Sequence, residues 1–242
     1  ELKKKKIKLI TGVKVEKVTT YGEGVTAYLS TGKEITAEKM LVTIGRAFNT
    51  DSLGLDKVGV ELGKRREIKI STTMQTSNPD VYAIGDVTGG MLLAHTASKE
   101  GIVAVHNAMG RHEEMDYTCV PSGIFTHPEI GSVGFRQHQL EERGIKFRTG
   151  NFQYRSLGKA HAMGEISGFF KILSDEAGEN ILGVHIIGMN SSDIIHEAAL
   201  AIKAGIGVKT LAETIHAHPT LSEGLMEAAE DLLGTAIHVP KK

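Results

Sequence analysis

The stretch that decides the fold is GFFKILSDEAGENILGVHII, residues 168–187. It contains two apolar runs, Gly168 to Ser174 and Ile181 to Ile187, on either side of a polar segment with Asp175 and Gly178. Short apolar runs bounded by turn residues predict strands, and the short polar segment predicts a hairpin connection. The stretch therefore indicates an antiparallel sheet in the second half of the chain.

The segments on either side of this hairpin predict a mixture of strands and helices. Apolar residues recur at helical spacing in some segments and as short strand-like runs in others. The expected elements are a strand at 130–135, a helix at 137–143, a strand at 147–154, a helix capped by Ser192 or Asp193, and helices at 208–215 and 222–233. Strands covered by helices on one face describe an α+β domain.

The first half of the chain predicts an α/β organisation. We expect β-structure through residues 7–44, and the apolar runs at Met40–Gly45 and Val81–Asp86 are typical of strands buried on both faces. Residues 94–109 carry a helical pattern. A change of composition near residues 117–121 predicts a domain boundary there.

Composition and charge exclude several function classes. The 242 residues include 28 basic and 29 acidic side chains, and the net charge of −1 favours neither nucleic acid nor an anionic membrane as a partner. No secretory signal is visible, and no apolar run approaches the roughly 20 residues of a membrane span. Eleven histidines show no metal-ligand spacing, so we expect no metal site. The single cysteine, Cys119, excludes an intrachain disulfide and indicates a cytoplasmic setting.

Two features of the first half are candidates for ligand binding. Asp86 ends the predicted strand at Val81–Asp86, where ligands bind in open α/β sheets, and its carboxylate suits a ribose or ribityl hydroxyl. An aspartate that merely begins a loop explains the same spacing equally well. The expected helix start at Leu93-Ala94-His95 presents unpaired amides that stabilise negative charge on a ligand, although every helix has such an end.

A third candidate is the segment from Ala217 to Glu223, whose sequence is AHPTLSE. A helix capped by Thr220 or Ser222 would place Glu223 in its first turn, within reach of His218. A histidine oriented by a carboxylate is the usual composition of a general base, because the carboxylate favours the protonated ring. Without further context, a surface histidine beside a capping glutamate is the simpler interpretation of this spacing.

Taken together, the motifs resemble the pyridine nucleotide–disulfide oxidoreductases, and within that family most closely the dihydrolipoamide dehydrogenases. The ordered set covers nearly the whole chain and is more specific than any single piece. It comprises Thr43-Ile44-Gly45-Arg46, Tyr82-Ala83-Ile84-Gly85-Asp86, Met91-Leu92-Leu93-Ala94-His95, Phe125-Thr126-His127-Pro128-Glu129, Ile181-Leu182-Gly183-Val184-His185 and the His218 segment. Mercuric and glutathione reductases share much of this set, whereas residues 217–223 and 236–238 favour the dihydrolipoamide branch.

The resemblance implies three domains and a set of roles. Residues 1–44 would be the end of an NAD-binding domain, 45–117 the end of an FAD-binding domain, and 118–242 an interface domain that forms a homodimer. FAD would be bound by Gly45, Arg46, Asp86 and the amides of Leu93, Ala94 and His95. His218, oriented by Glu223, would take a proton from dihydrolipoamide carried on an acyltransferase or carrier protein, and would serve the flavin and disulfide of the other subunit.

The chain departs from the family's pattern in the parts that the family carries upstream of these residues. The family's glycine-rich FAD and NAD loops and its paired redox cysteines have no counterpart here, and a thiol–disulfide relay needs two cysteines. The chain also begins at Glu1 without a cap, which suggests a truncated chain. We therefore expect no dehydrogenase activity and little FAD affinity from these residues alone. The alternatives are a stand-alone dimerisation or assembly module, or part of a mercuric or glutathione type reductase.

Overall fold

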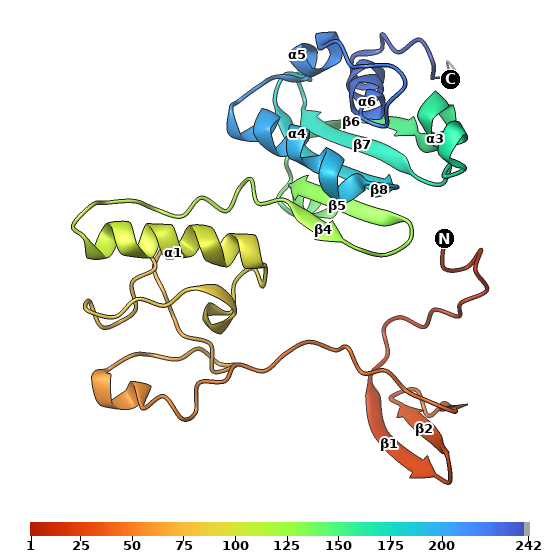
Figure 1. The fold of residues 1–242 in the computed structure, drawn as a ribbon. Helices are drawn as coiled ribbons and strands as arrows, with labels where there is room; N and C mark the ends of the chain where they lie inside the picture. The colour runs from red at the N-terminus through yellow and green to blue at the C-terminus, as the bar shows by residue number, and fades with distance from the viewer. Residues whose placement is uncertain (240–242) are drawn as a thin grey trace. The chain divides into compact units, whose positions relative to one another are not determined.

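The computed structural model describes residues 1–239, and the chain divides into two compact units, Glu1–Ala47 and Phe48–Lys242. The first unit is a small antiparallel sheet of three strands in the order β1-β2-β3 (Figure 1). Its strands are β1 (Val15–Tyr21), β2 (Gly24–Leu29) and β3 (Glu34–Ala37). The β-structure predicted for residues 7–44 is thus confirmed at its centre, between residues 15 and 37.

The predicted buried strand at Met40–Gly45 is wrong. No strand is assigned between residues 40 and 45, and the side chains of Leu41 and Ile44 are 86% and 95% exposed. A strand buried on both faces must pair within a sheet that is covered above and below, and no described strand of this unit pairs with this run.

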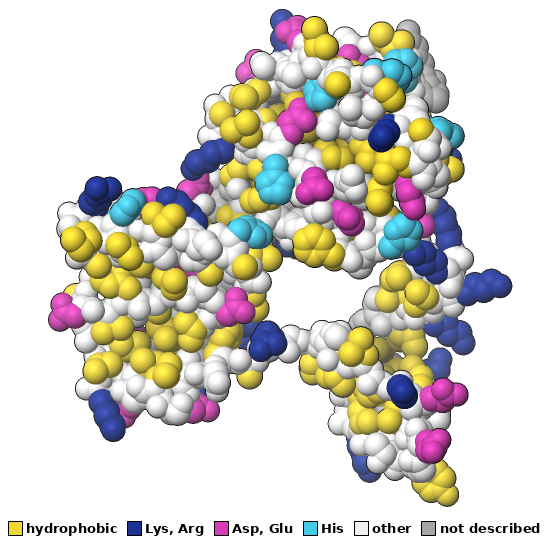
Figure 2. All heavy atoms as spheres, viewed as in Figure 1, with side chains coloured by type: hydrophobic (Ala, Val, Ile, Leu, Met, Phe, Trp, Pro, Cys, Tyr) yellow, Lys and Arg dark blue, Asp and Glu magenta, His cyan; other side chains and the backbone are white. Residues whose placement is uncertain are grey.

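Residues 48–117 contain one long helix among loops. The helix predicted at 94–109 is confirmed as α1 (Ala94–Ala108), and two short 3-10 helices precede it, η1 (Leu55–Val58) and η2 (Gly85–Thr88). The predicted strand at Val81–Asp86 is wrong, because this segment makes only a single bridge, between Tyr82 and Gln75. Figure 2 shows hydrophobic side chains gathered on the visible face of this part of the molecule.

The rest of the chain forms an antiparallel sheet of five strands in the order β4-β5-β8-β7-β6. The predicted hairpin is confirmed, because β7 and β8 pair antiparallel with Leu173 opposite Gly183. The strands are β4 (Ser122–Ile124), β5 (Glu129–Gly134), β6 (Phe147–Gln153), β7 (Phe169–Asp175) and β8 (Ile181–Gly188). The helices are α2 (Gln137–Glu142), η3 (Tyr154–Ser156), α3 (Gly158–Met163), α4 (Ser191–Lys203), α5 (Val208–Glu213) and α6 (Glu223–Leu233).

The largest hydrophobic core lies between this sheet and the two helices α4 and α6, as Figure 1 shows. Alternate residues of the central strands, such as Phe170, Ile172 and Val184, are fully buried on the covered face. Ile195 from α4 and Leu225 from α6 pack into the same cluster. Burial of each such side chain stabilises the fold by about 1.5–3 kcal/mol, so the predicted α+β domain is stabilised chiefly here.

Two glycines allow α6 to lie directly against the sheet. A Cβ at Gly150 of β6 would lie 2.1 Å from the carbonyl oxygen of Ala228, and a Cβ at Gly224 of α6 would lie 2.2 Å from the Phe170 ring. Neither distance is possible for a real side chain. The close approach fixes the first turn of α6, where Glu223 lies.

The side-chain caps predicted for α4 and α6 are wrong. The N-cap of α4 is Asn190, without a side-chain cap, because Ser192 donates its hydroxyl to Glu129 at 2.6 Å. Ser222 is the N-cap residue of α6 but makes no capping bond, and the Thr220 hydroxyl donates to Ala217 O at 2.8 Å. The Ser192 hydroxyl thus connects α4 to β5, and the Thr220 hydroxyl stabilises the loop before α6.

We predict that Gly150→Ala destabilises the sheet–α6 contact by about 1–3 kcal/mol, because the added methyl group overpacks the interface. Chemical denaturation of the variant and the parent chain measures this difference. Gly90→Ala is the matched control, since its Cβ would meet only the Thr88 hydroxyl, at 3.8 Å. Equal midpoints for Gly150→Ala and the parent would contradict the close approach.

Candidate active site

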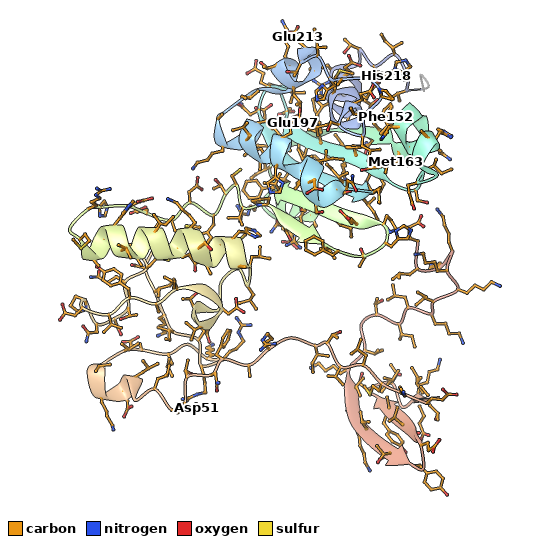
Figure 3. The ribbon with its side chains drawn as sticks, viewed as in Figure 1. Asp51, Phe152, Met163, Glu197, Glu213 and His218 are labelled. Carbon is orange, nitrogen blue, oxygen red and sulfur yellow. The ribbon has the colours of Figure 1, made fainter. Side chains whose placement is uncertain are left out.

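The loop between α5 and α6 brings His218 and Glu223 together. Nδ1 of His218 lies 2.8 Å from Oε1 of Glu223, and the amide of Thr220 donates to Oε2 of Glu223 at 2.7 Å. The peptide bond between His218 and Pro219 is cis. Figure 3 labels His218 beside the start of α6. Both carboxylate oxygens are thus engaged, and the imidazole is oriented through one nitrogen.

Exposure differs sharply across this pair. The His218 side chain is 74% exposed, whereas that of Glu223 is 17% exposed. Burial raises the pKa of the Glu223 carboxyl, but the hydrogen bonds from Thr220 and His218 outweigh burial and bring the pKa below its ordinary value. A charged carboxylate therefore lies behind the ring. Within residues 1–239, Nε2 of His218 makes no hydrogen bond, and the side chain that carries it is largely open to solvent.

A second histidine of the same loop, His216, anchors the loop to α4. Its Nε2 lies 2.8 Å from Oε1 of Glu197 and its Nδ1 lies 2.8 Å from the carbonyl oxygen of Thr214. Because a carbonyl and a carboxylate only accept hydrogen bonds, both ring nitrogens donate, so the ring is an imidazolium. The Glu197 hydrogen bond accordingly raises the pKa of His216, whose side chain is 7% exposed.

Sequence reasoning missed the His216–Glu197 pair. The two residues are 19 positions apart, on a loop and on α4, and no local motif connects them. The sequence signal that could have indicated the pair is Glu197, a charged residue among the apolar residues of α4. Figure 3 labels Glu197 on α4.

The predicted ligand-binding residues of the first half lie on different elements. Asp86 is exposed within η2, and its neighbour Gly85 packs against α1. The N-cap of α1 is Leu93, without a side-chain cap, so the amides that follow it have no side-chain acceptor within the described residues. Nε2 of His95 lies 2.8 Å from Pro121 O. Gly45 and Arg46 belong to the first compact unit.

Cys119 is a poor candidate for a nucleophile. Burial and the nearby Asp116 raise the pKa of its thiol, and the thiol donates to Ala199 O at 2.9 Å. No set of three or more histidine, cysteine, aspartate or glutamate side chains within residues 1–239 is placed to bind a metal ion. The same residues contain no helix with the length and apolarity that a membrane crossing requires.

Comparison with known protein families matches both parts of the chain. Residues 1–101 match the family described as pyridine nucleotide-disulphide oxidoreductase, and residues 120–229 match the dimerisation domain of the same family. The chain belongs to the pyridine nucleotide–disulphide oxidoreductases. The resemblance stated from the motifs is thereby confirmed, and the α+β domain that carries His218 is the family's dimerisation domain.

The similar proteins described next include two dihydrolipoyl dehydrogenases and one solved structure. Dihydrolipoyl dehydrogenase of Chlamydia muridarum is 42% identical over 97% of this chain and 50% of its own length. The enzyme of that name from Geobacillus stearothermophilus is 41% identical over 100% of this chain and 52% of its own. The crystal structure of LpdA from Mycobacterium tuberculosis has a TM-score of 0.86 at 29% identity, over 95% of this chain and 50% of that chain. The chain spans about half the length of the curated relatives it matches.

We predict that the Glu223 carboxyl titrates below the ordinary range of a glutamate, and that His218→Gln moves its midpoint upward. A lowered pKa stabilises the fold above the ordinary pKa, and this stabilisation is lost as the pH falls through the lowered value. Carbon NMR of the side-chain carboxyls, recorded as a function of pH, measures both midpoints. An unchanged midpoint in His218→Gln would show that the pair is not formed in solution.

We predict that Glu197→Gln lowers the free energy of unfolding by about 1–2 kcal/mol, because the charged hydrogen bond to His216 is lost. The pair stabilises the fold below the ordinary histidine pKa, and this contribution disappears as the pH rises through the raised pKa of His216. Denaturation at several pH values measures the difference. Glu213→Gln is the control, since Glu213 is 68% exposed and lies 3.7 Å from Lys209.

Proposed function

We propose that this chain is the C-terminal part of a dihydrolipoyl dehydrogenase, which oxidises dihydrolipoamide with NAD through FAD and a redox disulfide. The observation that carries the proposal is the His218–Glu223 pair, with one ring nitrogen engaged and the other exposed. The names of the similar proteins support the substrate. Within the proposal, residues 1–44 complete an NAD-binding domain, 45–117 an FAD-binding domain, and 118–242 form the interface domain.

In the proposed mechanism, His218 acts as the base. Its Nε2 takes the proton of a dihydrolipoyl thiol and leaves a thiolate, which is the nucleophile of thiol–disulfide exchange. Glu223 accepts a hydrogen bond from Nδ1, fixes the ring's orientation and stabilises the imidazolium that results. His216, already positively charged, acts only on the position of the loop. The carrier of the substrate would be an acyltransferase or carrier protein.

The residues near η2 and α1 fit a flavin. A bound FAD would supply the two-electron step between the disulfide and NAD. Asp86 presents an exposed carboxylate for a ribityl hydroxyl, and the uncapped amides after Leu93 suit the O2 region of the ring system. Gly85 has a φ of +72° and a Cβ there would lie 3.2 Å from Cβ of Ala97, so the turn lies close to the helix. Gly45 and Arg46 remain proposed contacts from the motif alone.

The partner within the proposal is a second copy of the chain. Residues 120–229 match a dimerisation domain, which supports a homodimer. By the resemblance to the family, His218 would serve the flavin and disulfide of the other subunit. A cytoplasmic location and the absence of nucleic acid or membrane partners stay predictions from composition.

The alternatives receive less support. A stand-alone dimerisation or assembly module would have no use for an exposed imidazole oriented by a carboxylate. Mercuric and glutathione reductases share the family, but the similar proteins described above carry the dihydrolipoyl dehydrogenase name. Dihydrolipoamide is therefore the substrate to test first.

We predict that His218→Gln in the complete enzyme lowers kcat by about 10²- to 10⁴-fold, the usual contribution of a general base, and that Glu223→Gln lowers it less. Steady-state oxidation of dihydrolipoamide with NAD measures both. His196→Gln is the control, since His196 lies exposed on α4 and bonds only its own helix, at Asp193 O. The 242-residue chain alone should show no turnover, and activity from it would overturn the proposal that the disulfide comes from other residues.

A further inference from the structure

Glu100, in the middle of α1, is a buried carboxylate with two strong hydrogen bonds. It is 1% exposed. Its Oε2 accepts the amide of Gly85 at 2.7 Å, and its Oε1 accepts the hydroxyl of Tyr117 at 2.7 Å. An ionised carboxylate is costly to bury unless its oxygens are satisfied, so these two bonds determine the position of both partners.

The first partner, Gly85, is the residue before Asp86. The same helix thus provides both proposed flavin contacts: its N-terminal amides after Leu93, and, through Glu100, the turn that carries Asp86. A Cβ at Gly101 would lie 3.3 Å from Cδ1 of Ile84, which shows how closely the helix packs on that turn. The Glu100–Gly85 bond fixes the distance between the two contacts.

The second partner, Tyr117, belongs to a linker that returns along α1. Three residues of the linker, Glu113, Tyr117 and Pro121, bind side chains of the helix. The Glu113 carboxylate accepts a hydrogen bond from Lys99 at 2.6 Å, and the Glu113 backbone binds the side-chain amide of Asn107. The Tyr117 hydroxyl donates to Glu100, and the carbonyl oxygen of Pro121 lies 2.8 Å from Nε2 of His95. Burial, and then hydrogen bonding to Glu100, raise the pKa of Tyr117, so its hydroxyl stays a donor. The linker ends where the dimerisation domain begins.

We propose that Glu100 is a positioning residue for the flavin: it sets the Asp86 turn against the amide end of α1 and ties both to the linker that leads to the dimerisation domain. The proposal rests on the proposed function for its ligand. Glu100 does not touch the flavin in this proposal. It acts through the backbone of Gly85, and Tyr117 aligns its carboxylate.

The test compares Glu100→Ala, Glu100→Gln and Tyr117→Phe. Alanine leaves the Gly85 amide without an acceptor and leaves the Tyr117 hydroxyl only the weak acceptor Sδ of Met74. Glutamine keeps an oxygen for Gly85 and offers an N–H to the Tyr117 oxygen, whose own hydrogen can turn to Sδ of Met74, 3.9 Å away. Phenylalanine removes only the alignment of the carboxylate. Glu114→Gln is the surface control, because its side chain is 62% exposed.

Three quantities are measured, in two samples. In the flavin-loaded complete enzyme, FAD dissociation and the flavin absorption spectrum are recorded. In the 242-residue chain without flavin, amide hydrogen exchange is followed across residues 84–89. We expect Glu100→Ala to weaken FAD binding about tenfold or more, to shift the flavin spectrum and to speed exchange at Gly85, with Tyr117→Phe intermediate. Glu100→Gln should restore all three to within about threefold of the parent.

The outcomes separate this inference from the proposed function. A parent enzyme that binds no FAD overturns the proposed function and the flavin role of Glu100 together. A parent that binds FAD, with Glu100→Ala unchanged in affinity and spectrum, overturns the positioning role alone. Faster exchange at Gly85 without any change in flavin properties also overturns it, because Glu100 would then stabilise the turn without serving the ligand.

Discussion

The structure depends on the contact between α6 and the sheet. Gly150 and Gly224 let the backbone of the helix lie against the strand and the Phe170 ring at distances that no side chain at those positions would permit. Because α6 begins at Glu223, the position of this one carboxylate follows from the packing of the helix. Core packing and the geometry of the site therefore depend on each other in this domain. A change in the contact between α6 and the sheet would move Glu223 relative to His218.

The two histidines of the loop before α6 differ in burial and in hydrogen-bond partners, and so they have different roles. His216 is buried and charged, with both nitrogens donating, and its pairing with Glu197 connects the loop to α4. His218 is exposed and has one nitrogen committed to Glu223. The same residue type thus anchors the loop at one position and presents a proton acceptor two residues later, and the difference comes from burial and from the number of acceptors each ring meets.

Much of the dimerisation domain was predictable because its signals are local. The hairpin of residues 168–187, the helices at α4 and α6 and the proximity of His218 and Glu223 all follow from apolar spacing or from residues within one turn of each other. The buried strands at 40–45 and 81–86 were wrong because strand pairing is a long-range property. Glu197 and Glu100 escaped prediction for the same reason, since their partners are distant in sequence and identifiable only in the folded chain.

The exposed run Met40-Leu41-Val42-Thr43-Ile44 also has a practical consequence. It is uncharged and rich in residues with high β propensity, and Leu41 and Ile44 are largely open to water. Such a segment is a template for cross-strand pairing between molecules. A lysine in place of Val42 would put a charge in the middle of this run and oppose such pairing.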